Sequence, residues 1–228
     1  MNQPTGLDGP RKEPASGGPA KQLVVLLHGL GADGEDLIGL APYLAQVMPD
    51  AAFVAPNAPF PSDMAPTGYQ WFSLQQSDPE QLYWGAEGAR GPLDRFIDAE
   101  LERHGLSDSE LALVGFSQGT MVALHTALRR ANPAAAIVGF SGALIDPERA
   151  SKEIASRPPV LLIHGEADPV VPFQMLAASQ RGLELLEVPV EALPRPGLEH
   201  SIDEEGLLAA IKFLALRFAG HPIGAEQP

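Results

Sequence analysis

Short apolar runs alternate with segments of helical spacing along most of the chain. The apolar runs have the length of buried strands and cover residues 22–27, 51–54, 111–116, 134–140 and 160–164. Residues 184–190 form a weaker candidate strand, because Pro189 suits an edge position. Apolar residues recur at helical spacing in the segments 36–48, 86–104, 119–131 and 204–218, which we expect to be helices.

This alternation of strands and helices predicts an α/β fold with a mostly parallel central sheet and helices on both faces. A chain of 228 residues fits a single domain of this kind, and we place it at residues 21–219. Residues 1–20 are rich in Pro and Gly and have no apolar core of a secretory signal, so we expect a flexible N-terminal tail. Residues 220–228 are expected to be a C-terminal tail.

Composition limits the possible partners. The 29 acidic and 15 basic residues give a formal charge of −14, which repels phosphate groups. We therefore expect no nucleic-acid partner and no stable membrane association. The chain has no cysteine, which excludes disulfides and a cysteine nucleophile.

The segment Gly115-Phe-Ser-Gln-Gly119 follows a predicted strand and precedes a predicted helix. This is the context of a nucleophile elbow, in which a sharp turn lifts the serine hydroxyl above the sheet. Ser117 is therefore the candidate nucleophile. Ser141 also follows a predicted strand, but it lacks the preceding glycine and a clear following helix, so we interpret it as a loop serine.

A serine hydroxyl needs a base, and the base needs a group that orients it. Asp168 follows the strand 160–164 in a turn stiffened by prolines, and it is the candidate acid, with Glu166 of the same turn as the substitute. His200 is the candidate base, because it lies in a polar turn after both Ser117 and Asp168.

The other histidines suit this role less well. His28 and His164 each precede a glycine at a strand end, where we expect them to shape loops. His104 and His125 belong to predicted helices and are expected on the surface, and His221 lies in the C-terminal tail.

The oxyanion formed by acyl transfer needs preorganised donors. One is expected to be the backbone N–H of Gln118, the residue after the nucleophile. The other is assigned to the N–H of Leu30, in the glycine-rich loop after the first long strand.

With these residues the chain resembles the phospholipase/carboxylesterase family of α/β-hydrolases, from about residue 22 to residue 219. The resemblance implies the α/β-hydrolase fold, the roles already given to Ser117, Asp168 and His200, and Leu30 and Gln118 as oxyanion donors. It also implies a cytoplasmic enzyme that needs no cofactor and often forms homodimers. The matching segments are Leu27-His-Gly-Leu-Gly-Ala-Asp-Gly34, Ala55-Pro-Asn-Ala-Pro59, Gln70-Trp-Phe72, Gly115-Phe-Ser-Gln-Gly-Thr120, His164-Gly-Glu-Ala-Asp-Pro-Val-Val-Pro172 and Gly197-Leu-Glu-His-Ser201.

Two positions depart from the family pattern. Ser73 follows the aromatic pair Trp71-Phe72 where members often have an acidic residue, and this weakens the match in the loop on the substrate side. Glu199 stands before the histidine where members often have glycine, and it places a negative charge beside the base. Neither change affects the three catalytic candidates.

We therefore predict a serine carboxylesterase that hydrolyses small-molecule esters, with short to medium acyl chains, through an acyl-enzyme. Trp71, Phe72 and Phe116 are candidates for the substrate pocket, and plain core packing is an equally good interpretation. A thioesterase or lysophospholipase of the same family, and a catalytically silent binding module, are the alternatives. A metallohydrolase is disfavoured because no histidine ligand cluster is present, and Asp33 and Asp36 are better explained as loop caps than as metal ligands.

Overall fold

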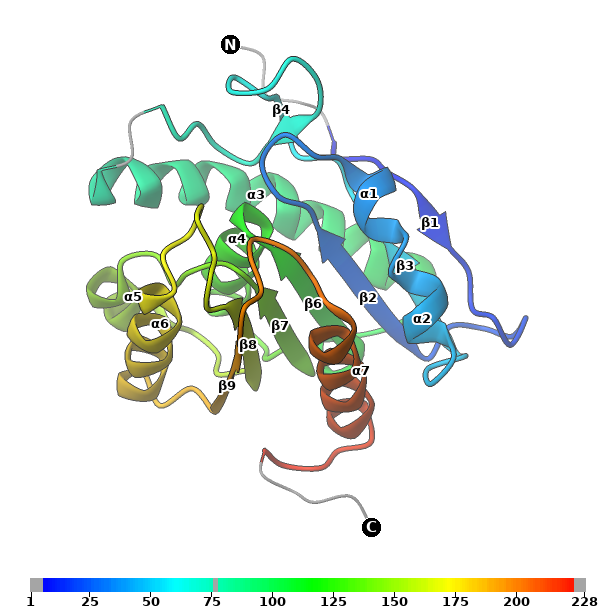
Figure 1. Cartoon of the computed structure of the whole chain (residues 1–228). Helices are drawn as coiled ribbons and strands as arrows, with labels where there is room; N and C mark the ends of the chain where they lie inside the picture. The colour runs from blue at the N-terminus through cyan, green and yellow to red at the C-terminus, as the bar shows by residue number, and fades with distance from the viewer. Residues whose placement is uncertain (1–5, 76–77, 224–228) are drawn as a thin grey trace.

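A mostly parallel sheet forms the centre of the computed structural model, which describes residues 6–75 and 78–223 (Figure 1). Within these residues the sheet has seven strands in the order β1-β3-β2-β6-β7-β8-β9, and only β1 runs antiparallel to its neighbour. The strands are β1 (Arg11–Lys12), β2 (Gln22–Leu27), β3 (Ala51–Val54), β6 (Leu111–Phe116), β7 (Ala136–Phe140), β8 (Val160–Gly165) and β9 (Val190–Arg195). A small separate hairpin joins β4 (Phe60–Pro61) and β5 (Tyr69–Gln70).

Helices cover both faces of the sheet (Figure 1). One face carries α3 (Pro79–His104), α4 (Gln118–Ala127), α5 (Pro147–Glu153) and α6 (Gln174–Leu185). The other carries α1 (Gly34–Ile38), α2 (Ala41–Ala45) and α7 (Glu204–Phe218), and a short 3-10 turn (Asp108–Glu110) precedes β6. Within the described residues no helix is both long and apolar enough to span a bilayer.

The central strands are apolar on both sides because both sides are covered. In β2, Leu23 and Val25 belong to the core under α3 and α4, whereas Val24 and Leu26 belong to the core under α1, α2 and α7. Alternate side chains of a strand point to opposite faces, so a strand buried on both faces appears in the sequence as a continuous apolar run. The expected α/β architecture is therefore present.

Several predicted boundaries change in the structure. The segment 36–48 forms two short helices instead of one, because Pro42 has no N–H to continue the hydrogen-bond ladder of α1. Helix α3 begins at Pro79, earlier than residue 86, and its N-cap Asp78 accepts hydrogen bonds from the N–H groups of Glu80 and Gln81.

The weak strand expected at 184–190 was wrong. Helix α6 extends to Leu185, and the strand follows it as β9. β9 lies at the edge of the sheet, where a proline costs no ladder hydrogen bond, and it accommodates Pro194 in register with His164.

Part of the segment expected to be a flexible tail is anchored to the domain. Arg11 and Lys12 pair with β3, and the guanidinium of Arg11 donates to Glu100 of α3 at 3.0 and 2.6 Å. A flexible tail was therefore the wrong expectation for these residues, because a nearly buried carboxylate of α3 binds the arginine. Residues 1–5, and residues 224–228 of the predicted C-terminal tail, lie outside the described residues.

His125 was wrongly expected on the surface. Its side chain is fully buried between α4 and α3, where Nε2 lies 3.0 Å from a carboxylate oxygen of Glu87. Helical spacing alone did not show that α3 covers this face of α4.

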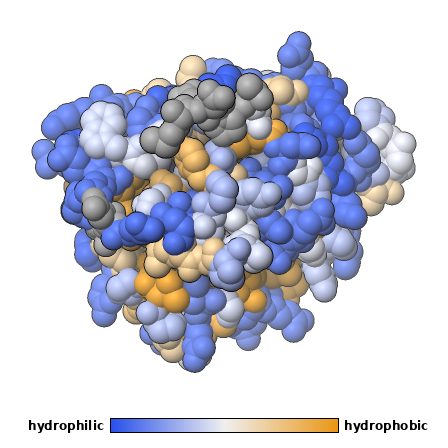
Figure 2. Space-filling view, turned by 90° about the horizontal axis from the view of Figure 1, so that it is seen from above, coloured by the Kyte–Doolittle hydropathy of each residue, from blue (hydrophilic) through white to orange (hydrophobic). Residues whose placement is uncertain are grey.

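The carboxyl ends of the parallel strands lie together at the upper end of the molecule in Figure 1. Figure 2 looks down on this end, where hydrophobic residues are exposed among hydrophilic ones. In open α/β sheets ligands bind at this edge, so a functional site is expected here.

Candidate active site

Ser117 lies between the end of β6 and the first turn of α4. Its φ of 54° is in the left-handed region, and its N–H donates to the carbonyl oxygen of Phe140 at 2.8 Å. The turn is tight because Gly119 lies against β2, where a Cβ atom would come within 1.9 Å of the carbonyl oxygen of Leu27. The second glycine of the motif therefore allows α4 to start directly over the sheet, with Ser117 at its N-terminus.

Asp168 lies in the loop after β8 with a fully buried side chain. Its Oδ1 accepts hydrogen bonds from the N–H groups of Val170 and Val171 at 2.8 and 2.9 Å. Its Oδ2 lies 2.7 Å from Nδ1 of His200. Burial acts to raise the pKa of Asp168, but the hydrogen bonds from His200 and the two amides outweigh it and lower the pKa. An ionised carboxylate is therefore positioned to orient the His200 ring.

Two loops that are far apart in sequence meet at this pair. The N–H of Ala167 donates to the carbonyl oxygen of Leu198 at 3.0 Å, and the N–H of Glu166 donates to that of Arg195 at 3.0 Å. Gly165 permits this approach, since a Cβ atom there would lie 2.2 Å from the carbonyl oxygen of Leu198. Glu166, the substitute acid, is exposed, and it is Asp168 that bonds to His200.

His164, near the end of β8, packs against the loop that carries Asp168. Its Nε2 donates to the carbonyl oxygen of Val171 at 2.9 Å and lies 3.4 Å from Oδ2 of Asp168. The ring is buried. His164 thus shapes a loop, which is the role that its position at a strand end predicts.

His200 lies next to the elbow, with its ring centroid 4.8 Å from that of Phe116. Within residues 6–75 and 78–223 the structure contains no hydrogen bond between the Ser117 hydroxyl and His200. Such bonds are often long or poorly aligned until substrate is bound. The structure thus brings His200 and Asp168 into direct contact beside the turn that carries Ser117.

Two backbone amides near Ser117 have no acceptor among the described residues. One is the N–H of Gln118, the first residue of α4, and the other is the N–H of Leu30 in the loop after β2. The loop after β2 approaches Ser117 closely at Gly29, where an added Cβ atom would lie 3.4 Å from Cβ of Ser117. Both amides, assigned to an oxyanion from the sequence, are therefore unpaired among the described residues.

The aromatic candidates are not in the pocket beside Ser117. Trp71 and Phe72 are buried in the core on the α3 and α4 side, and Phe116 packs against His200. Core packing is therefore the interpretation that the structure supports for Trp71 and Phe72.

An open apolar pocket of about 630 Å³ adjoins Ser117. The pattern of the sequence did not identify these residues, apart from Ser117 and Gln118, because they come from separate loops and helices. Met121 could have been found, since it lies about one helical turn after Ser117, the N-cap of α4. The pocket is lined by Leu74, Pro79, Leu82, Ser117, Gln118, Met121, Ala143, Leu144, Ile145, Asp146, Pro147, Val170, Val171, Pro172 and Met175.

Asp146 is the charged residue of this lining. It caps α5 by accepting the N–H of Arg149 at 3.0 Å, and its other oxygen lies 3.4 Å from the Arg149 guanidinium. Among the described residues neither Lys nor Arg lines the pocket, so its walls favour uncharged, apolar groups.

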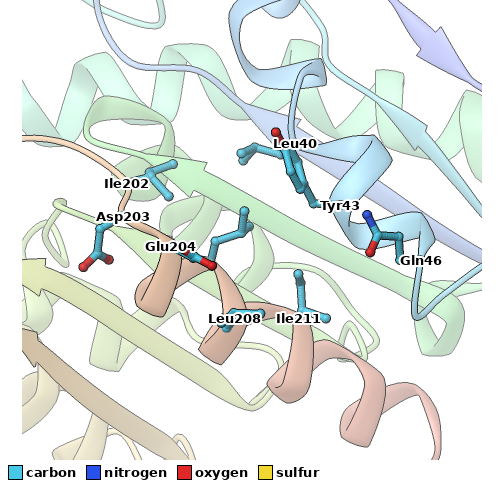
Figure 3. Close-up of a pocket in the computed structure, with 9 residues that line it drawn as sticks. Leu40, Tyr43, Gln46, Ile202, Asp203, Glu204, Leu208 and Ile211 are labelled. Carbon is cyan, nitrogen blue, oxygen red and sulfur yellow. The ribbon is translucent and has the colours of Figure 1, made fainter.

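A second hollow of about 540 Å³ lies between α2 and α7 (Figure 3). Tyr43 and Leu208 from the two helices are more than half exposed there. Ile202 and Asp203 connect it in sequence to His200, but none of the predicted catalytic residues lines it. It therefore has none of the chemistry found beside Ser117.

No metal site is evident in the part of the chain that the structure describes, where no group of three or more His, Asp or Glu side chains could hold an ion. Asp33 instead caps α1 by accepting the N–H of Asp36 at 3.2 Å. This is the loop-capping role expected for it.

Similarity to known proteins extends over most of the chain. The sequence model of the phospholipase/carboxylesterase family matches residues 14–218. The chain is 28% identical over 204 residues to the esterase YpfH of Escherichia coli (strain K12), covering 89% of this chain and 86% of that protein. It is 31% identical over 201 residues to acyl-protein thioesterase 1 of Schizosaccharomyces pombe, covering 83% of this chain and 88% of that one.

Among solved structures, the crystal structure of esterase PE8 superposes with a TM-score of 0.88 at 43% sequence identity. The match covers 92% of this chain and 98% of that chain. The family match spans far more than half of the sequence, and the sheet has the expected parallel order. The chain therefore belongs to the phospholipase/carboxylesterase family and has the α/β-hydrolase fold.

Proposed function

We propose that this protein is a serine carboxylesterase in which Ser117 is the nucleophile, His200 the base and Asp168 the acid. The observation that carries the proposal is the 2.7 Å contact between Asp168 and His200, located beside Ser117 at the N-terminus of α4. The esterase names of similar proteins support the class of reaction.

The first half of the reaction acylates the enzyme. His200 takes the proton of the Ser117 hydroxyl on Nε2 while Nδ1–H donates to Asp168, and the serine oxygen attacks the ester carbonyl carbon. The oxyanion accepts hydrogen bonds from the N–H groups of Leu30 and Gln118, and the N-terminal end of α4 adds a favourable dipole. Collapse of this intermediate breaks the bond to the alcohol, which leaves with the proton from His200.

The second half releases the acid. His200 removes a proton from water, the resulting oxygen attacks the acyl carbonyl of Ser117, and the same two amides hold the second oxyanion. Collapse returns the proton to Ser117 and frees the carboxylic acid. Every proton in this cycle moves through His200, and water is the co-reactant that supplies the second nucleophile.

The apolar pocket is the proposed site for the acyl chain. Ser117 and Gln118 lie in its wall, so a carbonyl group at Ser117 places an apolar chain against Met121, Leu144 and Leu82. Such walls suit short to medium acyl chains on small-molecule esters.

A thioesterase is the second candidate, supported by the similarity to an acyl-protein thioesterase over 83% of this chain. The chemistry is shared, because the same serine, histidine and amides act on a thioester carbonyl. Rates on an oxyester and a thioester with the same acyl group separate the two functions. A cytoplasmic location and a homodimer remain expectations from the family resemblance.

The test is hydrolysis of p-nitrophenyl esters with acyl chains from two to about twelve carbons by the wild-type protein and by Ser117→Ala. We expect wild-type activity on short and medium chains and a loss of at least about 1,000-fold in kcat for the variant, as for serine nucleophiles elsewhere.

Ser141→Ala is the matched control, because Ser141 also follows a sheet strand, is buried and has a positive φ of 47°. It should keep activity close to that of the wild type. Equal rates for Ser117→Ala and the wild type would contradict the proposal. A folded wild-type protein with no serine-dependent rate on any ester or thioester would favour the silent binding module.

A further inference from the structure

The two proposed oxyanion donors are the backbone N–H groups of Leu30 and Gln118, which are 88 positions apart in the sequence. Contacts between their segments must therefore hold the two N–H groups at a fixed distance in space. The segment Trp71–Phe72 lies between them. We propose that Trp71 is a positioning residue that links both halves of the oxyanion hole through its backbone and its indole N–H. This inference rests on the serine-esterase function proposed above.

The link to the Gln118 half uses two hydrogen bonds of a buried amide side chain. Oε1 of Gln118 accepts the backbone N–H of Trp71 at 2.8 Å, and Nε2 donates to the carbonyl oxygen of Phe72 at 2.8 Å. The Gln118 side chain is buried, so no water competes for these bonds. The residue that offers its backbone N–H to the oxyanion is thus tied by its own side chain to the 71–72 backbone.

The link to the Leu30 half uses the indole. Nε1 of Trp71 donates to the carbonyl oxygen of His28 at 2.9 Å, and the two rings pack with centroids 5.7 Å apart. Trp71 is completely buried and His28 nearly so. The indole therefore fixes the backbone at the point where β2 ends and the oxyanion loop begins.

The His28 ring also fixes the orientation of the Gly29–Leu30 peptide, which carries the Leu30 N–H. Its Nε2 accepts the N–H of Ala58 at 3.0 Å, so its proton is on Nδ1, which lies 2.7 Å from the carbonyl oxygen of Gly29. The N–H of Ala32 donates to the same oxygen at 3.3 Å. A trans peptide points its N–H opposite to its carbonyl, so holding the Gly29 oxygen directs the Leu30 N–H the other way. Burial lowers the pKa of His28, which keeps the ring in this neutral form.

The chain of contacts explains why Trp71 is a buried aromatic residue with a polar N–H. A phenylalanine would keep an aromatic ring in the core, but it is smaller than the indole and would leave the His28 carbonyl unpaired. We expect the resulting shift to weaken oxyanion stabilisation more than substrate binding, because the amides act mainly on charge that develops in the transition state.

The test is Trp71→Phe, with Trp84→Phe as the matched control. The sequence has two tryptophans, and Trp84 is 57% exposed on α3 outside the apolar pocket. We expect Trp71→Phe to lower kcat about 10- to 100-fold on p-nitrophenyl butyrate, with KM within about twofold of the wild type, since loss of one oxyanion donor costs about 100- to 1,000-fold. Trp84→Phe should leave both constants unchanged.

A boronic acid separates positioning from a general loss of structure. Phenylboronic acid forms a tetrahedral adduct with a serine and places an oxygen in the oxyanion hole. Its inhibition constant should rise in Trp71→Phe by about the same factor by which kcat/KM falls. Gln118→Met keeps the backbone N–H but removes both side-chain bonds, and it should show the same pattern if Trp71→Phe does not fold.

The possible outcomes are distinct. A wild-type kcat in both variants, a rise confined to KM, or an unchanged boronate affinity beside a reduced kcat would each overturn the role of Trp71 while leaving the serine-esterase function in place. A wild-type enzyme with no hydrolysis that depends on Ser117 would overturn both, because an oxyanion hole has no role without acyl transfer.

Discussion

At the scale of single residues, the site combines strain with tight restraint. Ser117 has a positive φ without being a glycine, and its N–H and carbonyl groups bond to Phe140 and to the first turn of α4. A non-glycine residue in this conformation costs about 1–3 kcal/mol, which the surrounding bonds must supply. The serine is kept there because the conformation exposes its hydroxyl at the end of the sheet.

Replacing Ser117 by glycine should relieve this strain. We expect Ser117→Gly to be more stable than Ser117→Ala by about 1 kcal/mol, the strain relief being partly offset by the greater backbone entropy of unfolded glycine. Urea unfolding of the two inactive variants measures the difference. If Ser117→Gly were the less stable of the two, the turn would not be strained.

At the scale of elements, α3 and α4 are joined by a polar pair made of a buried histidine and a partly exposed glutamate. His125 of α4 contacts Glu87 of α3, which is also bound by Arg90 at 2.6 Å. Burial lowers the pKa of His125 to about 4, and Arg129 and Arg90 act in the same direction, against the opposite effect of Glu87. The helix that carries Ser117 is thus held to α3 by a histidine that is neutral at pH 7.

This pair predicts a loss of stability in mild acid. The folded pKa of His125 lies below the value of about 6.5 in unfolded chains, so between these values the unfolded state binds more protons. Stability should therefore fall as pH drops from about 6.5 to about 4, by up to roughly 3 kcal/mol from this group.

Urea unfolding at several pH values in this range, on the wild type and on His125→Gln, checks the contribution. The glutamine keeps a hydrogen-bond donor for Glu87 but does not titrate. The variant should lose less stability on acidification, and identical losses in the two proteins would show that His125 is not responsible.

At the scale of the whole molecule, the net negative charge and the apolar pocket beside Ser117 both disfavour anionic ligands. The formal charge is −14, and the described wall of the pocket beside Ser117 contains no Lys or Arg and one carboxylate, Asp146, which is paired with Arg149. A field of one sign changes the local concentration of charged ligands in a cleft. Uncharged esters should therefore enter more readily than anionic ones.

Matched esters measure this preference. We expect kcat/KM for mono-p-nitrophenyl succinate to be about 10-fold or more below that for p-nitrophenyl butyrate at low ionic strength, and the gap to narrow as salt is added. Asp146→Asn should narrow it as well, since asparagine can still cap α5. Equal and salt-independent rates on the two esters would contradict the electrostatic argument.

The sequence by itself determined the five central strands β2, β3, β6, β7 and β8, the sharp turn at Ser117 and the order of the candidate chemical groups. Each depends on local physics: an apolar run of strand length, a glycine next to a tight turn, or a polar residue after a strand. The contact between Asp168 and His200 was predictable because the carboxyl ends of parallel strands share one edge, which brings the two residues together from separate loops.

Only the tertiary structure decided the features that depend on packing between distant segments. The pocket wall combines residues of α3 and α4 with the loops after β7 and β8. No local sequence pattern indicates that Leu144 or Leu82 is a neighbour of Ser117. His125 was expected on the surface and is buried, because α3 covers it. For Trp71 the sequence was equally consistent with pocket lining and with core packing. The tertiary structure places it in the core, where its backbone N–H donates to the Gln118 side chain and its indole N–H donates to the His28 carbonyl oxygen.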